Sequence, residues 1–383
     1  MKFEFDYNFK GILSVPARAL RAKKIIAASF YLLLAFLIFN IFGYLALLLD
    51  GAALSHIFST HGLIPFCPIP FDSIIASILF YFGVGLSILS VMAGMMAIAG
   101  FDFEEMRGNP FFSTKAGLKF SFRRLKQLLL SELAIIAFVA FIILLGIIVG
   151  LITRIPYLGE WLYSLFFFFP NFVIGLFTVL ILFVLSCSVL VMPAAVMADR
   201  NGESFNSILE TFSTVLRRPL HWVGYALYSV VAAKVAGFIF AYFAFRAVQF
   251  LKIITSLGGG EKIGNIVSSG MSHLPLDSRI VAFTTNLFPG IPFSFDLSTL
   301  CSGNDIGSAG YLMAIALFLI FLAIWGYMIS VIATGQAYAF AIIKKIRDGH
   351  AITDEKSLFY EEEWVNPPII DDKGTSESND IST

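Results

Sequence analysis

Charged residues are scarce in this chain of 383 residues: they make up 14% of it, whereas apolar residues make up 58%. Soluble domains carry about 25% charged and about 45–50% apolar residues. So little polar surface cannot cover a soluble globule of this length, and the composition therefore favours an integral membrane protein whose solvent is lipid. The formal net charge is zero, so no overall positive charge favours binding to nucleic acid.

The common catalytic signatures are also missing. The chain contains no His-Glu-x-x-His motif, no Gly-Lys-Ser/Thr phosphate loop and no Cys-x-x-Cys pair. We therefore expect no enzymatic activity, no metal site and no cofactor.

Six apolar runs are each long enough for a helix across the bilayer, which needs about 20 residues. They cover residues 25–49, 74–100, 132–152, 165–197, 222–245 and 309–343. The fourth contains Pro170 and Pro193, which predict a kink or the true helix start; a re-entrant segment followed by a helix is the alternative. The sequence thus predicts an all-α protein with a six-span domain, 25–345, between an N-terminal segment, 1–24, and a tail, 346–383.

Lysine and arginine are concentrated on one side of this topology. Segments 1–24, 101–131 and 198–221 each contain several, as does the stretch directly after the last run, whereas loop 50–73 has none and loop 153–164 has a single one. Short cytoplasmic loops carry the excess of basic residues in membrane proteins. We therefore expect both termini to lie in the cytoplasm.

Each basic segment contains an amphipathic stretch that predicts a helix on the membrane surface. Apolar residues recur with helical spacing in residues 205–216 and 118–129, and more weakly in 9–20, where Pro16 interrupts the pattern. A basic doublet accompanies each stretch, and we expect the doublets to contact anionic lipid headgroups. They are Lys23 and Lys24, Arg123 and Arg124, and Arg217 and Arg218.

The three doublets are almost evenly spaced along the chain. This spacing favours one unit of surface helix and transmembrane hairpin, used three times in tandem. The alternative needs no repeat, because any six-span protein with a cytoplasmic N-terminus gathers positive charge before its odd-numbered spans.

The third outer loop, 246–308, differs from the others in its length and its content of Gly, Ser and Pro. Loops this long are uncommon unless they are functional or mobile, and we expect this one to form a small cap over the outer face. The tail is acidic at Glu361–Glu363 and then polar, so we expect it to be partly disordered.

Lys234 is the most informative single residue, because it lies near the middle of the fifth apolar run. A charge at that depth is costly and indicates a functional site, while a structural lysine that packs in a groove is an equally good explanation. The other polar candidates within the runs are Asn40, Asn171 and Gln336. Side chains of this type commonly form hydrogen bonds between helices. These four residues are the candidate intramembrane polar site.

The chain has three cysteines. Cys67 and Cys301 fall in predicted outer loops, and Cys187 falls in the fourth run. In an oxidising exterior the first two can form a disulfide between the first and third outer loops, provided that their Cα atoms come within reach.

The stretch from Phe205 through Arg217-Arg218-Pro219 resembles a segment of uncharacterised bacterial multi-pass inner-membrane proteins. In that family an amphipathic helix ending in Arg-Pro precedes a span, and the turn at 154–160 adds to the likeness. The resemblance implies a bacterial inner-membrane location and brings no known activity.

These features favour a structural or interaction component of the inner membrane. Its partners would be the bilayer, anionic lipid headgroups, and other proteins or a second copy held by the surface helices and the acidic tail. The alternative is a transporter or channel that uses the polar site around Lys234.

Overall fold

The computed structural model describes most of the chain. The described residues are 7–61, 71–109, 112–199, 201–274, 276, 278–288, 290–301, 304 and 306–354. Within these ranges the protein is helical and has no strand, apart from one isolated bridge between Asn286 and Ser294.

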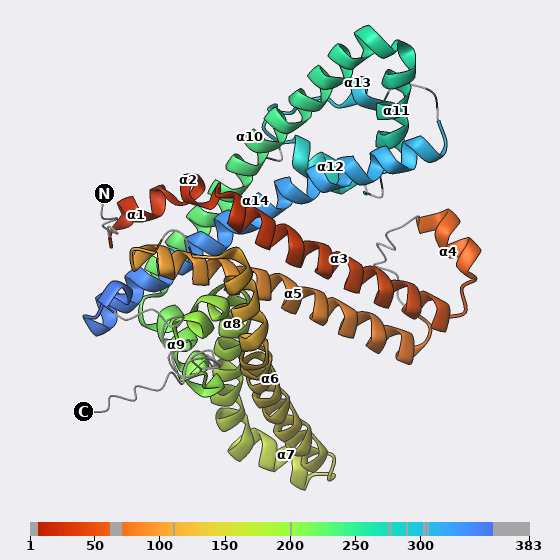
Figure 1. Cartoon of the computed structure of the whole chain (residues 1–383). Helices are drawn as coiled ribbons and strands as arrows, with labels where there is room; N and C mark the ends of the chain where they lie inside the picture. Colours follow the sequence, from red (N-terminus) through yellow and green to blue (C-terminus); the bar gives the residue numbers. More distant parts are fainter. Residues whose placement is uncertain are drawn as a thin grey trace, which may run out of the picture.

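Six helices in the described part of the chain are long and apolar enough to cross a membrane. They form three consecutive hairpins (Figure 1). The spans are α3 (Ala22–Leu49), α5 (Ile74–Met106), α6 (Thr114–Thr153), the joined elements α7 (Leu158–Leu162), η1 (Tyr163–Phe167) and α8 (Phe168–Ala198), α10 (Pro219–Gly259), and α14 (Ser308–Asp348). The predicted all-α integral membrane architecture with six spans is therefore confirmed.

Shorter helices connect or flank these spans. They are α1 (Phe9–Leu13), α2 (Val15–Ala19), α4 (Leu54–His61), α9 (Ser204–Arg217), α11 (Glu261–Ser272), α12 (Ser278–Thr285), α13 (Ser298–Cys301) and η2 (Ile352–Asp354). Helices α1, α2 and α9 lie near the ends of the spans where α5, α8 and α14 finish (Figure 1).

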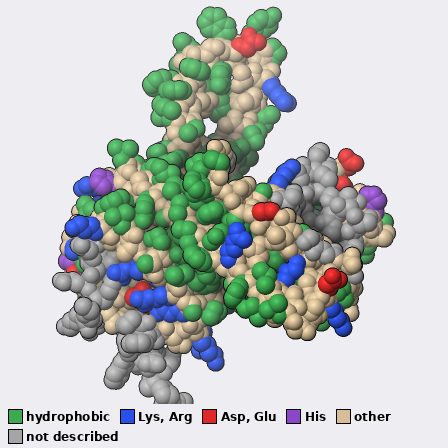
Figure 2. Space-filling view, turned by 90° about the horizontal axis from the view of Figure 1, so that it is seen from above, with side chains coloured by type: hydrophobic (Ala, Val, Ile, Leu, Met, Phe, Trp, Pro, Cys, Tyr) green, Lys and Arg blue, Asp and Glu red, His purple; other side chains and the backbone are tan. Residues whose placement is uncertain are grey.

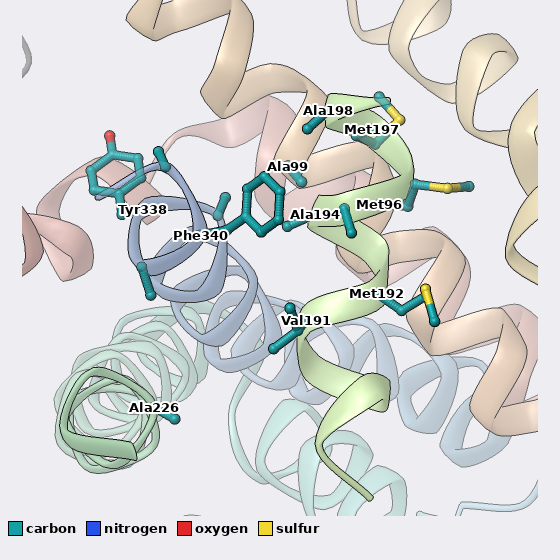
Figure 3. Packing of buried hydrophobic residues seen from close by; sticks show 14 of the residues in the cluster. Met96, Ala99, Val191, Met192, Ala194, Met197, Ala198, Ala226, Tyr338 and Phe340 are labelled. Atoms are coloured by element: carbon teal, nitrogen blue, oxygen red, sulfur yellow. The ribbon is translucent and has the colours of Figure 1, made fainter. Parts of the chain in front are cut away.

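One end of the spans forms the main hydrophobic core, which we call the hub. It consists of the C-terminal ends of α5, α8 and α14 together with α1, α2, α9, the N-terminal part of α6 and the start of α10. Figure 3 shows its packing, with Phe340 beside the small residues Ala99 and Ala194. Small side chains let helices approach closely within a membrane: a Cβ atom at Gly94 would lie only 2.9 Å from the Cβ of Tyr31.

The three hairpins diverge away from the hub as separate arms (Figure 1). Their outer parts carry large apolar side chains in place of the small ones, and many of these, such as Phe141, Phe177 and Leu312, are more than half exposed. Hydrophobic side chains also cover the arm that projects in Figure 2, where few charged side chains lie. Such surfaces suit contact with lipid.

The second predicted surface helix is not a separate element. Residues 118–129 belong to α6, which runs without a break from Thr114 to Thr153. At 1.5 Å per residue this helix is about 60 Å long, about twice the thickness of the hydrocarbon core. The expectation of three separate surface helices was wrong here, because neither Gly nor Pro interrupts the join between the amphipathic stretch and the span.

The fourth run is one continuous helical segment with a π-helical turn near its start, so it is not split by a re-entrant segment. Pro170 lies in the first turn of α8, directly after η1. A proline ring clashes with the carbonyl four residues earlier, here that of Phe166, which belongs to the wider π turn. Pro193 is accommodated inside α8.

In its described residues, the loop 246–308 is mainly helical. Helix α10 continues to Gly259, and α11, α12 and α13 occupy much of the remaining loop. Figure 1 shows α12 folded back between α10 and α14, toward the hub. The loop therefore returns into its own arm, where α12 contacts both α10 and α14.

Reporter fusions test the direction of the chain across the membrane. Gly202 lies at the hub between α8 and α9, whereas Gly259 lies at the far end of α10. We expect an alkaline phosphatase fusion to be active at Gly259 and inactive at Gly202, with the reverse pattern for a fluorescent reporter that folds only in the cytoplasm. Equal behaviour of one reporter at both positions would refute the six-span topology.

Candidate functional site

Lys234 lies on α10, about 23 Å along the helix axis from Pro219. Only 8% of its side chain is exposed. The helix carries small residues on either side of it, and at Gly237 a Cβ atom would come within 2.7 Å of the sulfur of Met328 on α14. Close packing of α10 on α14 therefore keeps Lys234 inside the arm.

The folded-back loop supplies the contacts of the Lys234 ammonium group. Its Nζ donates a hydrogen bond to the backbone carbonyl of Phe283 and lies 3.8 Å from the centre of the Phe283 ring. Nearby, Trp325 Nε1 of α14 donates to Thr284 Oγ1 at 3.1 Å. Hydrogen bonds from Lys234 and Trp325 thus connect α12 to α10 and to α14, respectively.

A cavity of ≈ 670 Å³ opens beside Lys234, between α10, α12 and α14. We call it the Lys234 cavity. Its charged lining residues are Lys234 and Arg279, Asn286 adds an amide, and the remaining lining is apolar. Among the described residues that line it there is no Asp or Glu. The cavity therefore combines positive charge with an apolar wall.

A second, apolar cavity of ≈ 270 Å³ adjoins the same segment of the loop. It is lined by Leu276, Ile280 and Phe318, together with residues of α3 and α5. Trp325 lines both cavities. The two cavities are therefore neighbours at the level of α12.

The four predicted intramembrane polar residues do not converge on one site. Asn40 lies on α3 and donates to the Phe36 carbonyl of its own helix at 2.7 Å, and Asn171 lies on α8 in a different arm. Gln336 lies on α14 one turn beyond Ile332, which lines the Lys234 cavity, so the two share a helix face. It is buried, and its side-chain amide has no hydrogen-bond partner among the described atoms.

The basic doublets have unequal surroundings. Arg123, Arg217 and Arg218 are exposed, as a contact with lipid headgroups requires, while Lys23 and Arg124 are partly buried. Lys24 departs from the prediction, because its side chain is 0% exposed. It points into the hub and not toward headgroups.

Lys24 forms a buried ionic cluster with two carboxylates of α5. Its Nζ lies 2.6 Å from Asp102 Oδ1 and 3.4 Å from Glu105 Oε2, and it also donates to the Arg18 carbonyl at 3.1 Å. Arg21 pairs with Glu105 as well. The cluster ties the N-terminal helices to the end of α5, where a buried charge is tolerated because it is paired.

Two further polar clusters join other parts of the hub. Gln127 of α6 donates to Asp199 Oδ2 and to Ser207 Oγ, each at 2.8 Å, and so links α6 to the α8–α9 turn. Arg347 at the end of α14 lies 2.7 Å from Glu210 of α9. These polar contacts therefore join α6 to the α8–α9 turn and α9 to the end of α14.

Sequence reasoning missed these clusters. The predicted second span ends at residue 100 and leaves Asp102 and Glu105 in the basic segment 101–131, whereas α5 continues through Met106 and buries both. A signal was present, since three acidic residues within four positions directly follow an unbroken apolar run. Their need for a basic partner points to Lys24 or its neighbours.

The predicted disulfide stays a prediction, since Cys67 lies outside the described residues. Cys301 is exposed at the surface, yet the protein around the sulfur desolvates it partly and raises the pKa of the thiol. The nearby Asp296 carboxylate accepts hydrogen bonds from the hydroxyl and the backbone N–H of Ser298, and these lower its pKa. The acidic tail beyond Asp354 also lies outside the described residues.

Together, the fold and its apolar arms define an integral membrane protein of the multi-pass helical class. Comparisons with protein-family models, with curated proteins and with solved structures found no match for the chain.

Proposed function

We propose that this protein is a structural or interaction component of a bacterial inner membrane and catalyses no reaction. The observation that carries the proposal is the use of polar side chains at the hub. Lys24 pairs with Asp102 inside the first hairpin, and Gln127 with Asp199 inside the second. Different hairpins are joined by the hydrogen bond between Tyr31 of α3 and Ser121 of α6, and by the one from Ser29 Oγ of α3 to the Leu322 carbonyl of α14. A fixed platform with three apolar arms suits a role in holding membrane components in place.

On this proposal the hub and both termini face the cytoplasm. The excess of Lys and Arg in segments that lie at the hub supports this assignment. Helix α9 buries its small polar residues against the hub and leaves Phe205 and Leu209 at least half exposed. An exposed apolar stripe that ends at Arg217 and Arg218 supports a position in the lipid interface.

The three hairpins are further proposed to be a tandem repeat. In support, each of them has a basic doublet before its first apolar run, and each starts and ends at the hub (Figure 1). The third hairpin carries the additional helices α11, α12 and α13. On this proposal the Lys234 cavity is a later addition to one of three similar units.

Crosslinking in intact cells, followed by purification in mild detergent, tests the interaction role. We expect the full chain to retain a defined protein partner in fixed stoichiometry. Replacing Glu361, Glu362 and Glu363 with Gln should lower the amount of partner that is retained several-fold, because the tail would lose its charge contacts. The matched control is Glu261→Gln, which removes an exposed carboxylate of α11 in the outer loop.

A full chain that retains lipid but no protein would contradict the interaction role. The second candidate function, a transporter or channel, would then gain weight. The observation that favours it is the Lys234 cavity, which places a cation inside an arm beside a loop that enters from the far end.

A further inference from the structure

We propose that the Lys234 cavity binds the anionic headgroup of a membrane amphiphile, a carboxylate or phosphate that carries an acyl chain. This inference goes beyond the interaction role and does not depend on it.

Charge is the first reason. Lys234 and Arg279 line the cavity, and none of the described lining residues is acidic. The buried charge is that of Lys234, and a charge buried within a membrane domain is costly unless it is compensated. The carbonyl and ring of Phe283 supply only partial negative charge to Lys234. An ammonium group has three donors, so hydrogen bonding to Phe283 leaves Lys234 donors for the oxygens of an anion.

Access is the second reason. Val230, Val231 and Phe283 line the cavity, and each is more than two-fifths exposed. They lie on the apolar surface of the arm, which faces lipid. A ligand therefore enters from the bilayer and not from water, and this favours an amphiphile over a free anion.

Shape is the third reason. The cavity volume of ≈ 670 Å³ falls within the range of about 300–1,000 Å³ that is usual for ligand pockets. The neighbouring cavity, lined by Ile280 and Phe318, is apolar, and Trp325 lines both cavities. An acyl chain suits that second cavity while the headgroup contacts Lys234 and Arg279.

Quenching of tryptophan fluorescence by brominated lipids tests the proposal, because Trp325 lines both cavities. The full chain in detergent is titrated with 9,10-dibromostearate, with brominated phosphatidylglycerol and with brominated phosphatidylcholine. We expect saturable quenching by one or both anionic probes, which also shows whether the headgroup is a carboxylate or a phosphate. Brominated phosphatidylcholine, the zwitterionic probe, should cause little quenching. Inorganic phosphate, added as a competitor, should displace little of the anionic probe.

Variants assign the binding to the cavity. Lys234→Met and Arg279→Gln should each lower the affinity for the anionic probe by about tenfold, which is the effect of losing a charge-assisted hydrogen bond. Lys234→Arg should retain the affinity. Lys252→Met is the control, because Lys252 lies on α10 but contacts Ser268 and Thr299 outside the cavity. Arg279 is exposed on α12, so we expect Arg279→Gln to fold. This variant therefore still tests binding in the cavity if Lys234→Met does not fold.

Three results would overturn the proposal. They are equal quenching by phosphatidylcholine, unchanged affinity in both Lys234→Met and Arg279→Gln, and displacement of the probe by inorganic phosphate alone.

Discussion

Replacing Lys24 with Met is expected to lower the free energy of unfolding by about 3–5 kcal/mol, the usual cost of removing one partner from a buried ion pair. Asp102 is 0% exposed, and its Oδ1 accepts from Lys24 Nζ at 2.6 Å, while its Oδ2 has no hydrogen-bond partner among the described atoms. Without Lys24 the Asp102 carboxylate would be buried without compensation. Glu105 is less affected, because Arg21 also pairs with it.

Unfolding of the purified protein in detergent measures this effect, with Lys23→Met as the matched control. Lys23 is the neighbouring residue and is only partly buried, so its loss should change stability little. The double variant Lys24→Met, Asp102→Leu should recover most of the loss, since an apolar pair of similar volume often replaces a buried ion pair without cost. Equal free energies of unfolding for Lys24→Met and Lys23→Met would show that the ionic cluster of Lys24 does not stabilise the hub.

Replacing Gly326 with Leu is expected to destabilise the protein by about 1–3 kcal/mol, the cost of overpacking a closely packed contact. Gly326 lies where α14 crosses α3. A Cβ atom there would approach Ser29 N at 3.1 Å and the Ile25 carbonyl at 3.2 Å, besides the Ser29 side chain. These are backbone atoms, so the helices themselves must separate. The hydrogen bond from Ser29 Oγ to the Leu322 carbonyl, 3.1 Å long, should also be lost.

The matched control for this change is Gly224→Leu in α10, where a Cβ atom meets nothing within 4 Å. It adds the same side chain to a spanning helix at an open position. Thermal aggregation of the solubilised protein, followed by size-exclusion chromatography, compares the two variants. Equal stability of Gly326→Leu and Gly224→Leu would contradict the close approach of α14 to α3.

The spans could be predicted because a single long apolar run is a local property of the chain. All six predicted runs lie within the helices observed. Their ends were less accurate: α6 begins at Thr114 and α10 continues to Gly259, well outside the predicted runs. Polar residues at both ends remain helical, because the hydrogen bonds of a helix do not require an apolar side chain.

The candidate site was predicted only in part. Lys234 stands out in the sequence because a charge in an apolar run is rare. Its contact with Phe283 could not be inferred, because it depends on the outer loop returning into the arm. The prediction that Lys24 contacts lipid failed for a similar reason. The sequence places it in a basic doublet, but only the approach of α5 brings Asp102 within reach.

The sequence alone determined the helical class, the six spans and the asymmetry of basic residues, since each follows from hydropathy and charge along the chain. Tertiary structure decided which ends of the spans pack together, where the carboxylates of α5 find their partners, and that α12 closes on Lys234. The physical reason is that apolar residues prefer lipid and the protein interior almost equally. Hydropathy therefore places a helix in the membrane, while the fit of small residues and the pairing of buried charges select its neighbours.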